Sequence, residues 1–168
     1  MQYARGVAQT LKGITDYTVK SPNNADWTLA VKRKLGELGT TYGFSTCASG
    51  RELKHDAEWL YDLVWYKCNH DNNDDARRLT EIPLVLESEW LRDFIQIRYD
   101  FEKLLLANSP IKVMVFWNLN AFEGLKDGIQ QYANGVHSVY ILACYEGPGF
   151  KIQTIESDQR MVKEISLV

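Results

Sequence analysis

The chain has 168 residues, 45% of them hydrophobic, which is enough for one domain with a sizeable core and too few for two ordinary domains. Its formal net charge of -3 argues against a protein that coats nucleic acid by bulk charge, although it is compatible with a local basic face. We therefore expect a single domain over residues 1–168, with any DNA contact confined to a small surface.

The cysteines and the hydropathy pattern indicate a cellular compartment. Cys47, Cys68 and Cys144 are widely spaced and form no CxxC pair, so neither a disulfide framework nor a structural zinc site is predicted. No run of about 18 apolar residues is present, and the first residues lack the basic and then apolar pattern of a signal peptide. These features predict a soluble cytoplasmic protein without a membrane partner.

The first helix predicted along the chain begins near Trp27, with Asp26 as its cap, and ends at Gly39. Residues 1–24 are a mixture of polar and small residues and carry no predicted element. The apolar face of the helix recurs at helical spacing through Trp27, Ala30, Val31, Leu35 and Leu38. The basic run 32–34 is expected on another face, where it is either solvated or in contact with a phosphate.

Residues 42–47 are predicted as a short extended piece, and residues 58–67, which are dense in aromatic and branched side chains, as a strand. Asp62 falls in the middle of this strand, where a carboxylate is poorly placed for solvent. Either the strand lies at an edge or Asp62 pairs with an arginine, or the carboxylate serves a function.

The acidic stretch 68–75 is predicted to be a solvated hairpin turn. It lacks the central glycine and the closing glutamate of a calcium loop. Cys68, His70 and Asp71 have the residue types of metal ligands, but their short spacing and the lack of further ligands do not favour a metal site.

The following strand returns through residues 79–82 to the stretch 84–90, which carries the most informative residues of the chain. Its branched apolar residues lead toward a core, yet it ends on Glu87 and Glu89, which a side-chain period of two places on the same face. Two neighbouring carboxylates repel one another, and moving them toward an apolar interior is unfavourable unless they share a cation or a proton. A divalent metal is the simplest explanation.

A long helix is predicted over residues 90–107. We expect it to be covered on two sides, by a main apolar stripe and by a second stripe of Ile95, Tyr99 and Leu106. Asp100 and Lys103 lie three residues apart on a remaining flank that can face the metal site. The main stripe consists of Trp90, Phe94, Ile97, Phe101, Leu104 and Leu105.

A buried strand at 111–117, a helix at 122–134 and a hairpin of two strands complete the chain, the hairpin strands covering 138–145 and 150–155. A strand, a crossover helix and a following strand pack as one unit, which places 112–117 beside the strand of Glu87. Asp62 and Glu87 can then meet and hold magnesium, whose remaining ligands are waters and a phosphate oxygen. Such a metal polarises a phosphodiester and supplies a water of lowered pKa.

This arrangement resembles the PD-(D/E)XK nuclease superfamily, to which restriction enzymes and many repair nucleases belong. The resemblance covers residues 27–117 and rests on Asp62 in a strand, Glu87 at the end of the next strand and the helix that follows at once. It implies an α/β fold with a restriction endonuclease-like αβββαβ core, in which helices flank a mixed central sheet, plus a C-terminal helix and hairpin. It also implies that Asp62 and Glu87 ligate magnesium or manganese.

The lysine position of the family motif is occupied here by Glu89, which is a departure from the pattern. Either Glu89 itself takes part in metal or water binding, or Lys103 acts as a migrated lysine from the following helix; we favour Lys103. Glu37 on the first helix matches an auxiliary acidic position of some family members.

We therefore expect a magnesium-dependent endonuclease acting on DNA, with catalytic residues Asp62, Glu87, Glu89 and Lys103, and a homodimer if both strands are cut. The alternative is a catalytically inactive domain of the same fold that serves as a binding or assembly module. In that case the carboxylates make only salt bridges, and their expected partners are Arg51, Arg77 or Lys103.

The remaining reactive and aromatic residues form no catalytic constellation. A nucleophile and base pair of Cys144 and His137 has no supporting residues nearby in the sequence, and the three histidines are expected at the surface or in hydrogen bonds. Trp59, Trp65 and Trp117 are expected in the core, with base stacking or a dimer face as alternatives.

Overall fold

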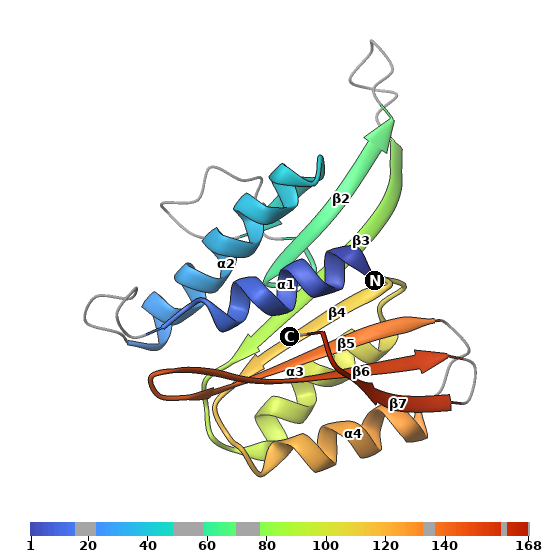
Figure 1. Cartoon of the computed structure of the whole chain (residues 1–168). Coiled ribbons are helices and arrows are strands. Elements are labelled where there is room, and N and C mark those ends of the chain that lie inside the picture. The colour runs from blue at the N-terminus through green and yellow to red at the C-terminus, as the bar shows by residue number, and fades with distance from the viewer. Residues whose placement is uncertain (16–22, 49–58, 70–77, 133–136, 159–160, 168) are drawn as a thin grey trace.

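The computed structural model describes residues 1–15, 23–48, 59–69, 78–132, 137–158 and 161–167, which form an α/β fold with helices flanking a seven-stranded mixed sheet (Figure 1). The predicted loop 68–75, apart from its first two residues, and the residues Arg51, His55 and Arg77 lie outside the described residues. None of the helices in these ranges is long and apolar enough to cross a membrane.

The elements follow one another along the chain in the order shown in Figure 1. They are α1 (Gln2–Lys12), α2 (Asn24–Thr41), β1 (Ser45–Ala48), β2 (Leu63–Asn69), β3 (Arg78–Glu89), α3 (Phe94–Leu106), β4 (Ile111–Phe116), α4 (Ala121–Gln131), β5 (Ser138–Glu146), β6 (Gly149–Asp158) and β7 (Met161–Ile165).

The strands lie in the sheet in the same order as in the sequence, from β1 to β7. β1, β2 and β3 pair antiparallel, β3, β4 and β5 pair parallel, and β5, β6 and β7 pair antiparallel. The predicted pairing of the strand of Glu87 with the strand after the helix is confirmed, because Glu87 lies opposite Met114 in the parallel pair.

Each face of the sheet has its own apolar core. Leu63 and Leu86 lie in the core that α1 and α2 cover, whereas their chain neighbours Val64 and Val85 lie in the core that α3 and α4 cover. This alternation is the period of two expected for strands buried on both faces. All six residues of β4 are buried accordingly, as predicted.

The N-terminal half differs from the prediction in two places. α1 was not predicted, although Ala4, Val7, Ala8 and Leu11 are fully buried at helical spacing. In α2 the N-cap is Asn23 and not Asp26, because the Asn23 side chain accepts from the Asp26 amide at 3.0 Å while the Asp26 carboxylate accepts from the Asn23 amide.

One predicted apolar stripe and one predicted core tryptophan are exposed. The prediction that the helix after β3 is covered on two sides is wrong, because the side chains of Ile95, Tyr99 and Leu106 are 60%, 67% and 71% exposed. The core placement of the tryptophans holds for Trp65, which is fully buried, but not for Trp59, which is exposed.

The close approach of α2 to the sheet depends on one glycine. The Trp65 indole donates from Nε1 to the Leu35 carbonyl at 3.0 Å, and a Cβ added at Gly39 would lie 2.6 Å from that nitrogen. No side chain therefore fits at position 39 without moving either the buried ring or the helix.

We expect Gly39→Ala to lower the free energy of unfolding by about 1 to 3 kcal/mol, because the new methyl group overpacks a buried site. Gly13→Ala is the matched control, since its Cβ meets only backbone oxygens at 3.4 Å or more and Gly13 is right-handed helical. Urea unfolding of both variants tests this, and equal midpoints would contradict it.

Candidate functional site

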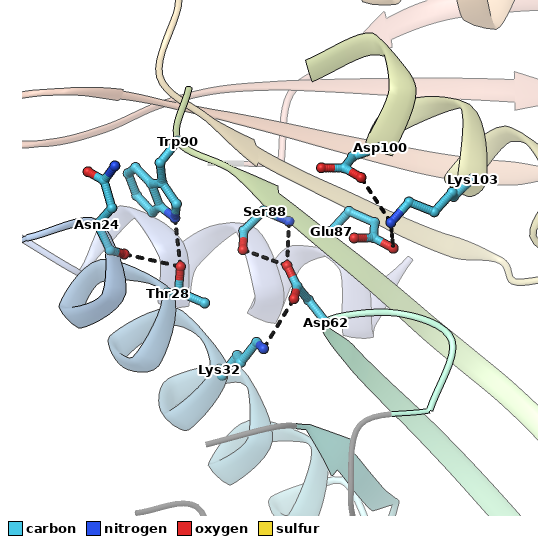
Figure 2. Close-up of polar contacts among 9 residues, drawn as sticks. All are labelled: Asn24, Thr28, Lys32, Asp62, Glu87, Ser88, Trp90, Asp100 and Lys103. Carbon is cyan, nitrogen blue, oxygen red and sulfur yellow. Dashed lines mark hydrogen bonds and ion pairs between the residues drawn. The ribbon is translucent and has the colours of Figure 1, made fainter. Parts of the chain in front are cut away.

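Asp62 lies in the bend that precedes β2 and not in the middle of a strand, as the sequence had indicated. The last antiparallel pair joins Leu63 to Leu86, so Asp62 and Glu87 are the next positions on the two strands. Asp62 Oδ2 accepts from the Ser88 amide at 2.8 Å and from Ser88 Oγ at 2.6 Å (Figure 2). The carboxylate thus satisfies a β3 amide beyond the end of the pairing with β2.

The other oxygen of Asp62 pairs with a lysine and not with an arginine. Lys32 Nζ on α2 lies 3.1 Å from Asp62 Oδ1, and the Lys32 side chain is only 4% exposed. The predicted solvated or phosphate-contacting face for Lys32 is therefore wrong. A buried ammonium is tolerated only beside an opposite charge, and Asp62 supplies it.

Glu87 is the buried carboxylate of the site, and its partner comes from α3. Its side chain is 5% exposed, and Lys103 Nζ lies 3.0 Å from Glu87 Oε1. The same ammonium lies 2.9 Å from Asp100 Oδ1, so Lys103 sits between two carboxylates (Figure 2). The structure thus brings Lys103 to Glu87.

Burial raises the pKa of Glu87 to about 7. Lys103 opposes this rise, whereas the negative charges of Asp62 and Asp100 add to it. Burial lowers the pKa of Lys103, but the contacts with Asp100 and Glu87 outweigh burial and raise it above its ordinary value. Near neutral pH the site therefore holds a charged lysine and a glutamate that readily takes up a proton.

The donor set fits a hard divalent cation in part. Lys103 Nζ lies 3.0 Å from Glu87 Oε1, so this buried oxygen already has a cationic partner. Magnesium is commonly held by one or two carboxylates, with waters and substrate phosphate completing its shell. Within the described ranges no three His, Cys, Asp or Glu side chains form a metal cluster. The Asp62 carboxylate is directed toward Lys32 on α2 and the Glu87 carboxylate toward Lys103 on α3, and these helices cover opposite faces of the sheet, so the two carboxylates do not converge on one cation in this arrangement.

The two other acidic candidates lie apart from these contacts. Glu89 is half-buried at the end of β3, and its carboxylate accepts from the Leu91 amide at 2.6 Å. Glu37 is exposed on α2 and pairs with Lys34 at the surface.

Sequence reasoning missed Lys32 and Ser88. A signal for Lys32 is present, because it lies four residues after Thr28 and three before the buried Leu35, and so on their face of the helix. Thr28 Oγ1 in turn accepts from Trp90 Nε1 at 2.7 Å, which ties α2 to the end of β3 (Figure 2). Ser88 carries no such signal, since its role depends on the bend at Asp62.

No family model, curated protein or solved structure matches the chain. The functional argument therefore rests on the residues and geometry of the site.

The raised pKa of Glu87 predicts how stability depends on pH. Between about pH 4.5 and 7 the unfolded chain loses the Glu87 proton while the folded chain keeps it, so the wild type loses stability as the pH rises through this range. Glu87→Gln cannot lose this proton, so we expect the variant to gain roughly 3 kcal/mol relative to the wild type between pH 4 and 8. Denaturant unfolding at several pH values measures the difference, and parallel pH profiles for the two proteins would contradict the prediction.

Proposed function

We propose that the chain is a magnesium- or manganese-dependent nuclease of the PD-(D/E)XK type, hydrolysing phosphodiester bonds of DNA. The observation that carries the proposal is the approach of Lys103 to the buried Glu87 carboxylate, next to Asp62 at the adjoining position of the neighbouring strand. Carboxylates that can hold a metal ion and a lysine that can offset developing negative charge are side chains that metal-assisted phosphodiester hydrolysis uses.

The order of the elements supports the same proposal. α2 is followed by the three antiparallel strands β1 to β3, then by α3 and by β4 parallel to β3. This is the αβββαβ order that the family resemblance implies, and the candidate residues lie just before its second strand, at the end of its third strand and on its second helix.

In the proposed mechanism Asp62 and Glu87 would be the protein ligands of a metal ion, which would polarise the phosphodiester and supply a water of lowered pKa. Ser88 and Lys32 occupy both oxygens of Asp62, so metal binding would require this carboxylate to exchange partners. Lys103 is positively charged and stabilises the negative charge that builds up on the phosphate, while Asp100 positions its ammonium. Glu89 contributes less, since its carboxylate is bound to the Leu91 amide.

Two further consequences follow from the proposal. Metal binding must displace the proton of Glu87, so metal affinity rises with pH up to about 7. Cleavage of both DNA strands needs two such sites, which a homodimer provides.

The carboxylates are tested by isosteric substitutions. We expect Asp62→Asn and Glu87→Gln each to slow magnesium-dependent cleavage of supercoiled plasmid by at least about 100-fold, because each removes a proposed metal ligand. Glu123→Gln on the exposed surface of α4 is the control and should cleave like the wild type. Cleavage that survives both site substitutions, or that persists in EDTA, would show that another site is responsible.

The role of Lys103 is tested by comparison with Lys126, a second lysine that pairs with an acidic residue on its own helix. Lys103→Met should lower the cleavage rate by roughly 100- to 1,000-fold, the range found when one group that stabilises transition-state charge is removed. Lys126→Met is the matched control, because Lys126 on α4 also pairs with an acidic residue three positions away. Equal rates for the two variants in the plasmid assay would remove Lys103 from the mechanism.

A second candidate function is a catalytically inactive domain of the same fold that acts as a binding or assembly module. One observation favours it, namely that Asp62 and Glu87 each already have a lysine partner, so the site is charge-compensated without a metal. Calorimetry of the full chain separates the two functions. Absence of magnesium and manganese binding at millimolar ion would favour the inactive module.

A further inference from the structure

A pocket of about 430 Å³ lies where the parallel strands β3, β4 and β5 end. The loops after β3 and β4 contribute Arg92, Trp117 and Asn118, and the end of β5 contributes Tyr145 and Glu146. Its volume is within the range of ligand sites, and open α/β sheets bind ligands at the carboxyl ends of their parallel strands. The pocket is distinct from the contacts of Asp62 and Glu87.

Arg92 and Trp117 form a stacked pair in this pocket. The guanidinium carbon lies 4.0 Å from the centre of the Trp117 ring, and Asn118 Nδ2 donates to the Arg92 carbonyl at 2.8 Å, which fixes the loop. Stacking occupies one face of the guanidinium and leaves its in-plane N–H donors available. Within the described ranges Arg92 has no carboxylate partner, so an exposed, oriented cation lines the pocket.

The pocket and the Glu87 carboxylate lie on opposite faces of the sheet. Trp117 and Tyr145 pack against the core that α1 and α2 cover, whereas Met114, which lies opposite Glu87 in the parallel pair, belongs to the core that α3 and α4 cover.

The charged groups of the pocket restrict the ligand. A planar guanidinium binds phosphate through its edge and stacks on a base through its free face. Glu146 is acceptor-only when ionised, so it disfavours a second phosphate and matches the amino group of a base. A nucleotide within a strand, with one singly charged phosphate and one base, satisfies these groups together.

We propose that this pocket binds one unpaired nucleotide of a nucleic-acid strand. Arg92 contacts the phosphate, and the base stacks against the Arg92–Trp117 pair with its edge toward Glu146. The proposal rests on the proposed nuclease function, for which it identifies a substrate feature, namely an unpaired nucleotide.

The test is the binding of a fluorescently labelled single-stranded oligonucleotide to the full chain in EDTA, followed by anisotropy. Arg92→Gln and Trp117→Leu should each weaken binding roughly 5- to 50-fold. Arg92→Gln should also reduce the salt dependence by about one phosphate contact. Arg98→Gln is the matched control, because Arg98 is an exposed arginine on α3 paired with Glu102, and it should bind within twofold of the wild type.

Several outcomes would overturn the pocket. The proposal fails if the wild type does not bind the oligonucleotide, or if Arg92→Gln binds it with wild-type affinity. It also fails if Arg98→Gln loses as much affinity as Arg92→Gln, or if an abasic oligonucleotide binds as tightly as the intact one. A nucleoside monophosphate that competes as well as the oligonucleotide would assign the pocket to free nucleotides and also overturn the proposal. Arg92 is exposed, so Arg92→Gln should fold normally. The test therefore remains decisive even if Trp117→Leu fails to fold.

Cleavage and oligonucleotide binding, measured side by side on the wild type and on Arg92→Gln, separate this proposal from the nuclease proposal. If binding depends on Arg92 but the wild type cleaves nothing, the nuclease function fails and the pocket stands. If the wild type cleaves while Arg92→Gln binds and cleaves normally, the pocket fails and the nuclease function stands.

Discussion

The burial of the Glu87 carboxylate is the constraint on which the rest of the site depends. An ionised glutamate at this depth is unstable without a compensating charge, and the fold supplies it from the helix that connects the parallel strands β3 and β4. Because α3 must pack on the sheet through Ile97, Phe101 and Leu104, Lys103 is carried to Glu87 by the same packing that forms the core. The core packing and the ion pair of Glu87 therefore both depend on α3.

This coupling explains which parts were predictable from sequence. The helical spacing of Ile97, Phe101 and Leu104 defines the buried face of α3, so the position of Lys103 beside it follows from geometry. The strand, helix and strand order likewise predicts that β3 and β4 are neighbours, and a period of two predicts that Glu87 shares a face with the buried Val85.

The parts that sequence reasoning missed depend on contacts between distant residues. Lys32 resembles any charged residue on an amphipathic helix, and its burial becomes favourable only because Asp62, thirty residues later, ends beside it. The exact start of β2 is equally non-local, since Asp62 replaces a strand partner for the amide of Ser88. α1 is clearly amphipathic, with Ala4 and Ala8 fully buried on its apolar face, but no side-chain cap marks its start.

The missing side chain at Gly39 has a consequence beyond packing. It sets how near α2 can come to the Trp65 ring, and the same helix carries Lys32 to Asp62 two turns earlier. An outward displacement of α2 would lengthen that ion pair and leave the Asp62 charge less balanced, which would make proton release from Glu87 harder. The distance between α2 and the sheet therefore affects the pKa of Glu87, although the Glu87 carboxyl group lies on the face of the sheet that α2 does not cover.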